Sequence, residues 1–147
     1  DKPGQELFCV YDSAAFARQR RPPGPPKWPP HTLKMSDDLE SDKDQDRRQL
    51  LSKNGVCHAV VQEDGNLVVY RESGQSLWSS GTAGKGKGPY KLVMQTDGNL
   101  VLYDSKSAAL WQSGTAGTNA NKAVMQDDCN LVVYFDSAAK WDSKSFQ

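Results

Sequence analysis

The sequence predicts an all-β domain in which three similar units pack around a shared axis. A nine-residue motif occurs three times, a tryptophan follows each copy, and glycine-rich segments separate the copies. The three copies and their tryptophans are Gln62–Tyr70 with Trp78, Gln95–Tyr103 with Trp111, and Gln126–Tyr134 with Trp141. Repeats of this length are typical of folds whose units cannot bury an apolar face alone and share one core.

Within each unit the pattern is one of short strands joined by turns. In the second unit Lys91–Met94 is a short apolar run, Asp97–Gly98 is a tight-turn pair, and Leu100–Tyr103 is rich in strand-forming residues. A second turn at 104–107 leads into Ala108–Trp111, and no helical periodicity is present. We therefore expect three or four strands per unit, arranged as three small antiparallel sheets that enclose a common core.

Alternation along the strand assigns its two faces. Asn99, Val101 and Tyr103 share one side, and Leu100 and Leu102 share the other. If the leucine side is the core, the side with Asn, Val and Tyr faces the solvent. The side chains expected inside are Leu67, Leu100, Leu131, Trp78, Trp111 and Trp141.

The outward face of each unit carries a set of groups that suits a sugar. A carboxylate supplies acceptors, amides supply donors and acceptors, tyrosine supplies a hydroxyl, and valine methyls suit the C–H face of a pyranose. The set contains no general base or activated nucleophile, so it predicts binding without catalysis. The candidate binding residues are Gln62, Asp64, Asn66, Val68, Tyr70, Gln95, Asp97, Asn99, Val101, Tyr103, Gln126, Asp128, Asn130, Val132 and Tyr134.

A purely structural interpretation of the motif stays open. Asp-Gly and Asn form turns in any hairpin, and Tyr and Val are ordinary strand residues. That interpretation does not explain why Gln and Tyr return in all three copies.

Composition narrows the classes of partner and cofactor. The 147 residues carry 18 basic and 18 acidic side chains, which favours neither nucleic acid nor an anionic membrane surface as partner. No apolar run approaches the ~20 residues of a spanning helix, so no membrane insertion is expected. The three cysteines and two histidines lack metal-ligand spacing, so we expect no metal and no cofactor. The chain begins at Asp1, so a signal peptide has been removed or was never present.

The threefold Gln-x-Asp-x-Asn-x-Val-x-Tyr motif, with a tryptophan after each copy, resembles the bulb-type mannose-binding lectin family (B-lectins). The resemblance covers residues 33–147 and implies a β-prism II, with three antiparallel four-stranded sheets in a pseudo-threefold arrangement. It further implies metal-independent binding of α-D-mannose and mannose-rich glycans. In the family Asp and Asn contact the axial 2-hydroxyl, Gln the 3-hydroxyl and Tyr the 4-hydroxyl, while Val packs on the ring carbons. All fifteen motif positions are intact here.

The resemblance also implies a disulfide. Plant members bridge the residue after the first motif's Asp to a cysteine five residues before the next motif's Gln. Here Cys129 follows Asp128 and Cys57 lies five residues before Gln62, which is the cyclic equivalent of that pair. We therefore expect a Cys57–Cys129 disulfide, with two buried free thiols as the alternative.

Together these expectations predict that the protein is a secreted agglutinin that acts in innate defence. Its partners would be mannose and high-mannose glycans on cell surfaces or glycoproteins, and a homodimer could form by exchange of the C-terminal strand near 139–142. The alternatives are a lectin-like antimicrobial protein of the bacteriocin type and a storage protein with the same fold. The rival fold is a β-trefoil, whose repeats are longer and carry a Gln-x-Trp signature.

Residues 1–32 fit no repeat and are expected to form a flexible Pro-rich extension. The segment Arg20–Pro30 favours an extended, polyproline-like backbone. It contains Arg-x-x-Pro-x-x-Pro, a pattern that SH3-type domains bind, although a simple spacer is the favoured interpretation. Cys9 is left over and is either free or paired between molecules.

Overall fold

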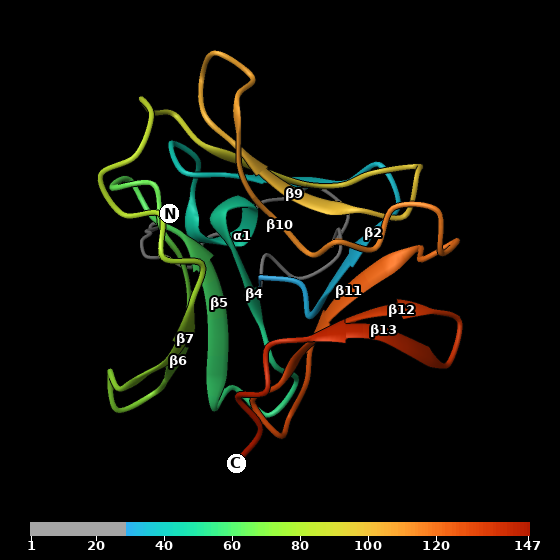
Figure 1. Cartoon of the computed structure of the whole chain (residues 1–147). Coiled ribbons are helices and arrows are strands. Elements are labelled where there is room, and N and C mark those ends of the chain that lie inside the picture. The colour runs from blue at the N-terminus through green and yellow to red at the C-terminus, as the bar shows by residue number, and fades with distance from the viewer. Residues whose placement is uncertain (1–28) are drawn as a thin grey trace, which may run out of the picture.

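A computed structural model describes residues 29–147 as three four-stranded antiparallel sheets that surround a common core (Figure 1). The first sheet contains β4 (Gln49–Leu51), β5 (Cys57–Val61), β6 (Leu67–Arg71) and β7 (Ser76–Ser79). The second contains β3 (Asp38–Glu40), β8 (Lys91–Met94), β9 (Leu100–Tyr103) and β10 (Ala109–Gln112). The third contains β2 (Thr32–Lys34), β11 (Lys122–Met125), β12 (Leu131–Phe135) and β13 (Ala138–Asp142). The predicted β-prism II architecture is confirmed.

Each repeat supplies three strands of its sheet, and the fourth comes from elsewhere in the chain. β2, β3 and β4 follow one another between Thr32 and Leu51, yet each pairs with a different sheet, through β11, β8 and β5 respectively. This segment therefore ties the three repeats together. Between β3 and β4 lies α1 (Gln45–Arg48), a single helical turn that the sequence pattern did not predict.

The core has the face assignment that the alternation predicts. Leu67, Leu100 and Leu131 are completely buried. The three tryptophans pack edge to face around the axis, with ring centroids 5.2 to 5.4 Å apart and interplanar angles of 68° to 70°. They remain partly exposed, because the cluster lies at the margin of the buried leucines and valines.

One backbone position recurs in a left-handed conformation at the turn of each motif. Gly98 has φ of 91°, and a Cβ built there would lie 3.0 Å from the carbonyl oxygen of Thr115. In the third motif Cys129 occupies this position with φ of 71°. Its sulfur is bonded to Cys57 of β5, with the two Cα atoms 5.4 Å apart. The disulfide that the resemblance implied is confirmed, and it joins the third repeat to the first.

The remaining expectations concern the two ends of the chain. Cys9 and the Arg20–Pro26 pattern lie outside the described residues. The carbonyl oxygen of Pro30 accepts a hydrogen bond from Leu51 N (2.9 Å), so backbone pairing with the domain begins before Leu33. At the other end β13 pairs with β12 of the same chain. Across residues 29–147 no helix is long and apolar enough to cross a membrane.

Candidate functional site

Each motif begins with a tight turn that the Gln backbone and the Asp side chain help to define. In the second motif Gln95 N donates to Asn99 O (2.9 Å) and Gly98 N donates to Gln95 O (3.1 Å). One oxygen of Asp97 accepts from Asn99 N (2.9 Å). The first and third motifs repeat this pattern with the same partners at similar distances. Because only Oδ1 of each Asp is used in the turn, Oδ2 is left available at an exposed position.

The Gln and Tyr side chains of each motif meet across the hairpin. The amide nitrogen of Gln95 donates to the hydroxyl of Tyr103, and Gln126 makes the same bond to Tyr134. In the first motif the Gln62 amide satisfies both of its neighbours when its oxygen accepts from Tyr70 (2.5 Å) and its nitrogen donates to Asp64, at 3.1 Å from Oδ1 and 3.3 Å from Oδ2. The structure therefore brings Gln, Asp and Tyr of one motif to one side of its sheet.

The Asn side chain anchors the segment that follows the third strand of its unit. In the second unit Asn99 Oδ1 accepts from Ser113 Oγ (3.2 Å), Gly114 N (3.1 Å) and Thr115 N (3.2 Å). The Thr115 hydroxyl in turn donates to Gly98 O (2.5 Å). Equivalent bonds join Asn66 to Ser80 and Thr82, and Asn130 to Ser143 and Ser145. The structural interpretation of Asn is thus correct for its oxygen, while its amide nitrogen takes no part in these bonds.

The partner of that amide nitrogen differs among the three units. Asn99 Nδ2 donates to Gln112 Oε1 (2.7 Å), and Asn130 Nδ2 donates to Asp142 Oδ2 (2.9 Å). The equivalent residue of the first sheet is Ser79, and within residues 29–147 the Asn66 amide nitrogen has no bonded partner. The three candidate sites are therefore alike in their motif residues and unlike in what borders them.

Two of the five side chains are less exposed than the alternation predicts. Val68, Val101 and Val132 lie on the predicted face, but each is only 3% exposed. Asn99 and Asn130 are 6% and 8% exposed. The expectation that these groups are presented openly to solvent is wrong, because β6, β9 and β12 are central strands whose outer side chains are flanked on both sides by those of neighbouring strands. Asp remains exposed, and Gln and Tyr are intermediate.

A different residue lies opposite the motif tyrosine in each sheet. Tyr70 stacks on His58, with centroids 5.4 Å apart and planes inclined by 28°. Burial lowers the pKa of His58 below its ordinary value of 6.5, so the neutral imidazole is favoured there. The equivalent partner of Tyr103 is Lys91, and that of Tyr134 is Lys122.

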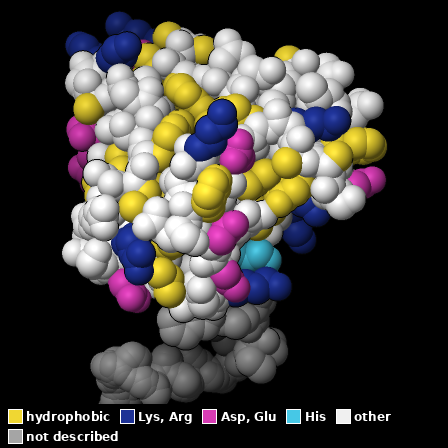
Figure 2. Space-filling view, turned by 60° about the horizontal axis from the view of Figure 1, so that its bottom comes forward, with side chains coloured by type: hydrophobic (Ala, Val, Ile, Leu, Met, Phe, Trp, Pro, Cys, Tyr) yellow, Lys and Arg dark blue, Asp and Glu magenta, His cyan; other side chains and the backbone are white. Residues whose placement is uncertain are grey.

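Cavities adjoin the second and third motifs. One of about 560 Å³ lies beside Tyr103 and is lined by Glu40, Lys91, Val93 and Asp104 among others. Another of about 550 Å³ includes Gln126 and Asp128 of the third motif in its wall. Both are large enough for a hexose. Figure 2 shows one face of the molecule, on which apolar, basic and acidic side chains are interspersed.

The chemistry of these groups is that of a binding surface. In the described part of the chain no group of three or more His, Cys, Asp and Glu side chains is arranged to hold a metal ion. The hydroxyls of Ser113 and Thr115, together with Gln112 and Asp142, are parts of the sites that the motif alone did not identify. The hydroxyl residues could have been found in the sequence from the recurrent Ser-x-Thr or Ser-x-Ser, which begins two residues after each tryptophan.

Comparison with solved structures finds lectins that share this fold. No family model matches the chain, and no curated protein matches it by sequence. A mannose-binding lectin from Gastrodia elata is 34% identical with a TM-score of 0.68, covering 80% of this chain and 99% of that one. The lectin of Marasmius oreades is 30% identical with a TM-score of 0.67, covering 79% and 92%. The mannose-specific agglutinin of snowdrop (Galanthus nivalis), solved with methyl-α-D-mannoside, is 33% identical with a TM-score of 0.62, covering 71% and 89%.

Proposed function

The chain belongs to the bulb-type mannose-binding lectin family, and on that premise we propose that it binds α-linked mannose and mannose-rich glycans at three sites. The sites are the outer faces of the three sheets at the motif residues named above. The snowdrop relative was solved with a mannoside, which makes mannose the first ligand to test.

The observation that carries the proposal is the threefold recurrence of one hydrogen-bonding set. In every unit an exposed Asp keeps one oxygen outside the turn, the Asn amide nitrogen takes no part in holding the segment after the third strand, and a Gln–Tyr pair lies beside them. A sugar hydroxyl donates to a carboxylate and accepts from an amide at the same time, so this set suits it. Turn formation alone requires neither the Gln–Tyr pair nor the Asn amide nitrogen.

We propose that the sites bind their ligand and do not transform it. Within residues 29–147 the Asp of each motif is exposed and the Tyr is hydrogen-bonded to Gln, and neither is hydrogen-bonded to a base that would activate it; His58 stacks on the Tyr70 ring without such a bond. A shallow site of this kind binds a monosaccharide at about millimolar strength, near −4 kcal/mol. Three sites on separate faces raise the avidity for clustered glycans by about 10² to 10⁴.

The proposed setting is extracellular, in agglutination or innate defence. The Cys57–Cys129 disulfide supports it, because disulfides persist in oxidising compartments. The bacteriocin-type and storage alternatives are not favoured, since the relatives described above are lectins.

The test replaces the outward carboxylate oxygen and keeps the turn. Asp64→Asn, Asp97→Asn and Asp128→Asn retain the Oδ1 acceptor for the turn and convert Oδ2 into a donor. We expect the wild-type chain to bind methyl-α-D-mannoside in an NMR titration and mannose-rich glycans on an array. The triple variant should lose both signals while its unfolding curve stays unchanged.

Glu63→Gln is the matched control, since Glu63 is an exposed neighbour of Asp64 at a variable position of the motif. It should bind as the wild type does. Absence of mannoside binding by the wild type, or full binding by the triple variant, would contradict the proposed function.

A further inference from the structure

The outer face of each sheet carries a row of three side chains that ends at the motif tyrosine. In each sheet the motif tyrosine has a cross-strand partner on the neighbouring strand (β5, β8 or β11). That partner in turn lies opposite a residue of the edge strand (β4, β3 or β2). The rows are Leu51–His58–Tyr70, Glu40–Lys91–Tyr103 and Lys34–Lys122–Tyr134. The three proposed sugar sites therefore have borders of different charge.

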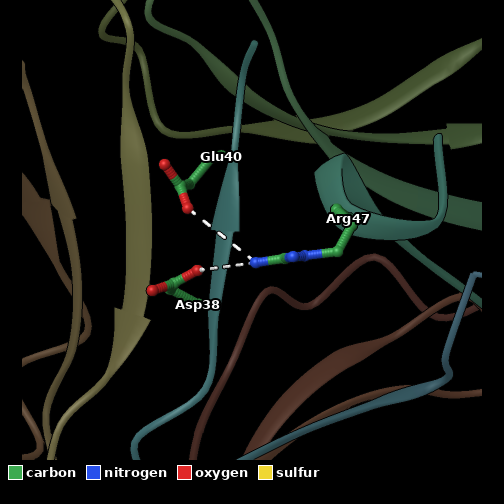
Figure 3. Close-up of polar contacts among 3 residues, drawn as sticks. All are labelled: Asp38, Glu40 and Arg47. Atoms are coloured by element: carbon green, nitrogen blue, oxygen red, sulfur yellow. Dashed lines mark ion pairs between the residues drawn. The ribbon is translucent and has the colours of Figure 1, made fainter. Parts of the chain in front are cut away.

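The second row is charge-balanced. Glu40 of β3 lies opposite Lys91, and Arg47 of α1 reaches over the same strand (Figure 3). Arg47 Nη2 lies 3.9 Å from Glu40 Oε2 and 4.0 Å from Asp38 Oδ1. Two cations thus face two carboxylates, and little net charge remains at this border.

The third row places two lysines directly opposite each other. Lys34 and Lys122 are cross-strand partners, an arrangement in which like charges destabilise a sheet. Within residues 29–147 the ion pairs involve only Arg47 and Arg48 as cations, so neither lysine is neutralised there. Lys122 Nζ lies 5.8 Å from the centre of the Tyr134 ring. An unbalanced pair beside a binding motif indicates a role in binding.

A groove runs along this lysine pair. It consists of two adjoining cavities of about 630 and 550 Å³ that share His31, Thr32 and Lys122 in their walls. Lys34 lines the first cavity, and Lys53 lines the second.

Asp37 is the acidic residue beside Lys34: its Oδ2 accepts from the Lys34 backbone N (3.1 Å), but within residues 29–147 it forms no ion pair with the lysine ammonium. Asp127 and Asp128 line the end of the groove next to Gln126, and Asp127 Oδ1 accepts from Asn54 N (3.0 Å). At the other end, Asp136 Oδ1 lies 3.5 Å from Asn121 Nδ2. The first of the two cavities, which Lys34 and Lys122 line, has no acidic residue in its wall.

We propose that the third site recognises a mannose residue carrying an anionic ester, a phosphate monoester, with Lys34 and Lys122 binding the phosphate. This inference rests on the proposed function, because the third motif would hold the sugar ring while the groove holds the substituent. A dianionic phosphate beside two ammonium groups forms charge-assisted hydrogen bonds and removes the repulsion within the Lys34–Lys122 pair. Neither of the other two rows offers such a pair.

The experiment compares methyl-α-D-mannoside with mannose 6-phosphate in NMR titrations of the full chain at low ionic strength. We expect the third site to bind the phosphate ester about fivefold more tightly than the mannoside, and 1 M salt to remove most of that preference. Lys34→Glu recreates the Glu40–Lys91 arrangement of the second sheet and relieves the lysine repulsion, so the variant should fold. It should abolish the preference for phosphate and leave the methyl mannoside affinity unchanged.

Lys43→Glu is the matched control, because it makes the same charge reversal at an exposed position outside the groove. It should keep the preference. Inorganic phosphate alone should compete weakly, since it lacks the sugar ring.

The proposal is overturned if the wild type binds both sugars equally, if Lys34→Glu retains the preference, or if Lys43→Glu loses it. It is also overturned if inorganic phosphate binds as tightly as the ester, because the groove would then be a free-anion site. Failure to bind either sugar would instead refute the proposed function itself.

Discussion

Asn99, in the turn that precedes β9, donates a hydrogen bond of 2.7 Å from its Nδ2 to Oε1 of Gln112 in β10. The Asn99 oxygen is already held by the segment after β10, so this bond fixes the amide plane completely. One amide hydrogen is left to meet a ligand. In the first unit Ser79 stands where Gln112 does, and no such bond to Asn66 is present within the described residues.

We expect Gln112→Ala to weaken mannoside binding at the second site by about two- to tenfold. The loss corresponds to one net hydrogen bond of about 0.5–1.5 kcal/mol that orients the Asn99 amide before the ligand arrives. Ser79→Ala removes a side chain from the equivalent position where no bond exists, and should leave the first site unchanged. An NMR titration that follows each turn's amide signals separates the sites. An equal loss in both variants would refute the orienting role.

The strand faces could be predicted from sequence because the side chains of a strand alternate and one face is buried. Leu100 and Leu102 are fully buried, and Tyr103 lies on the opposite face, as the alternation requires. The degree of exposure could not be predicted. Val101 is flanked by Val93 and Gln112 on the neighbouring strands, and neither register is encoded within the motif.

The sequence pattern also did not predict which segments supply the fourth strand of each sheet. β3 consists of Asp38, Leu39 and Glu40, in which a single apolar residue faces the core. Three residues give too little periodicity to assign a strand, and nothing local indicates that it pairs with β8. The disulfide, in contrast, was implied by family resemblance, because its two cysteines stand in the cyclic positions of a known pair.

Removing the disulfide should lower the free energy of unfolding by about 2–4 kcal/mol. Cys57 and Cys129 are separated by 72 residues, so the bond restricts a long loop of the unfolded chain. Denaturant unfolding of the Cys57→Ala, Cys129→Ala variant measures the effect. A second variant, Cys57→Ala with Cys129→Gly, should recover about 1 kcal/mol, because glycine adopts the left-handed φ of 71° without a steric penalty. If the two variants are equally stable, the backbone conformation at 129 contributes nothing.

His58 should make the protein less stable as the pH falls below about 6.5. Its pKa is lowered in the folded state by burial, so the unfolded chain binds the proton more readily. The stability linked to His58 is therefore complete above the unfolded pKa of 6.5 and is lost as the pH falls from there towards the folded pKa. His58→Gln should remove this part of the pH dependence in denaturant unfolding between pH 7 and pH 5. An unchanged pH profile in that variant would contradict the assignment.

Gly98→Ala should damage both stability and the second site, whereas Gly114→Ala should affect stability alone. Both glycines have positive φ, of 91° and 73°, so each substitution has a conformational penalty of about 1 kcal/mol. A Cβ at Gly98 would also lie 3.0 Å from Thr115 O and 3.1 Å from Ala120 N, which are backbone atoms that cannot move alone. Relief of that contact displaces the turn that places Asp97 and Asn99. A Cβ at Gly114 meets nothing within 4 Å, so the turn stays in place there. Thermal unfolding and mannoside titration of the two variants test the difference, and equal affinity at the second site would show that the turn tolerates the displacement.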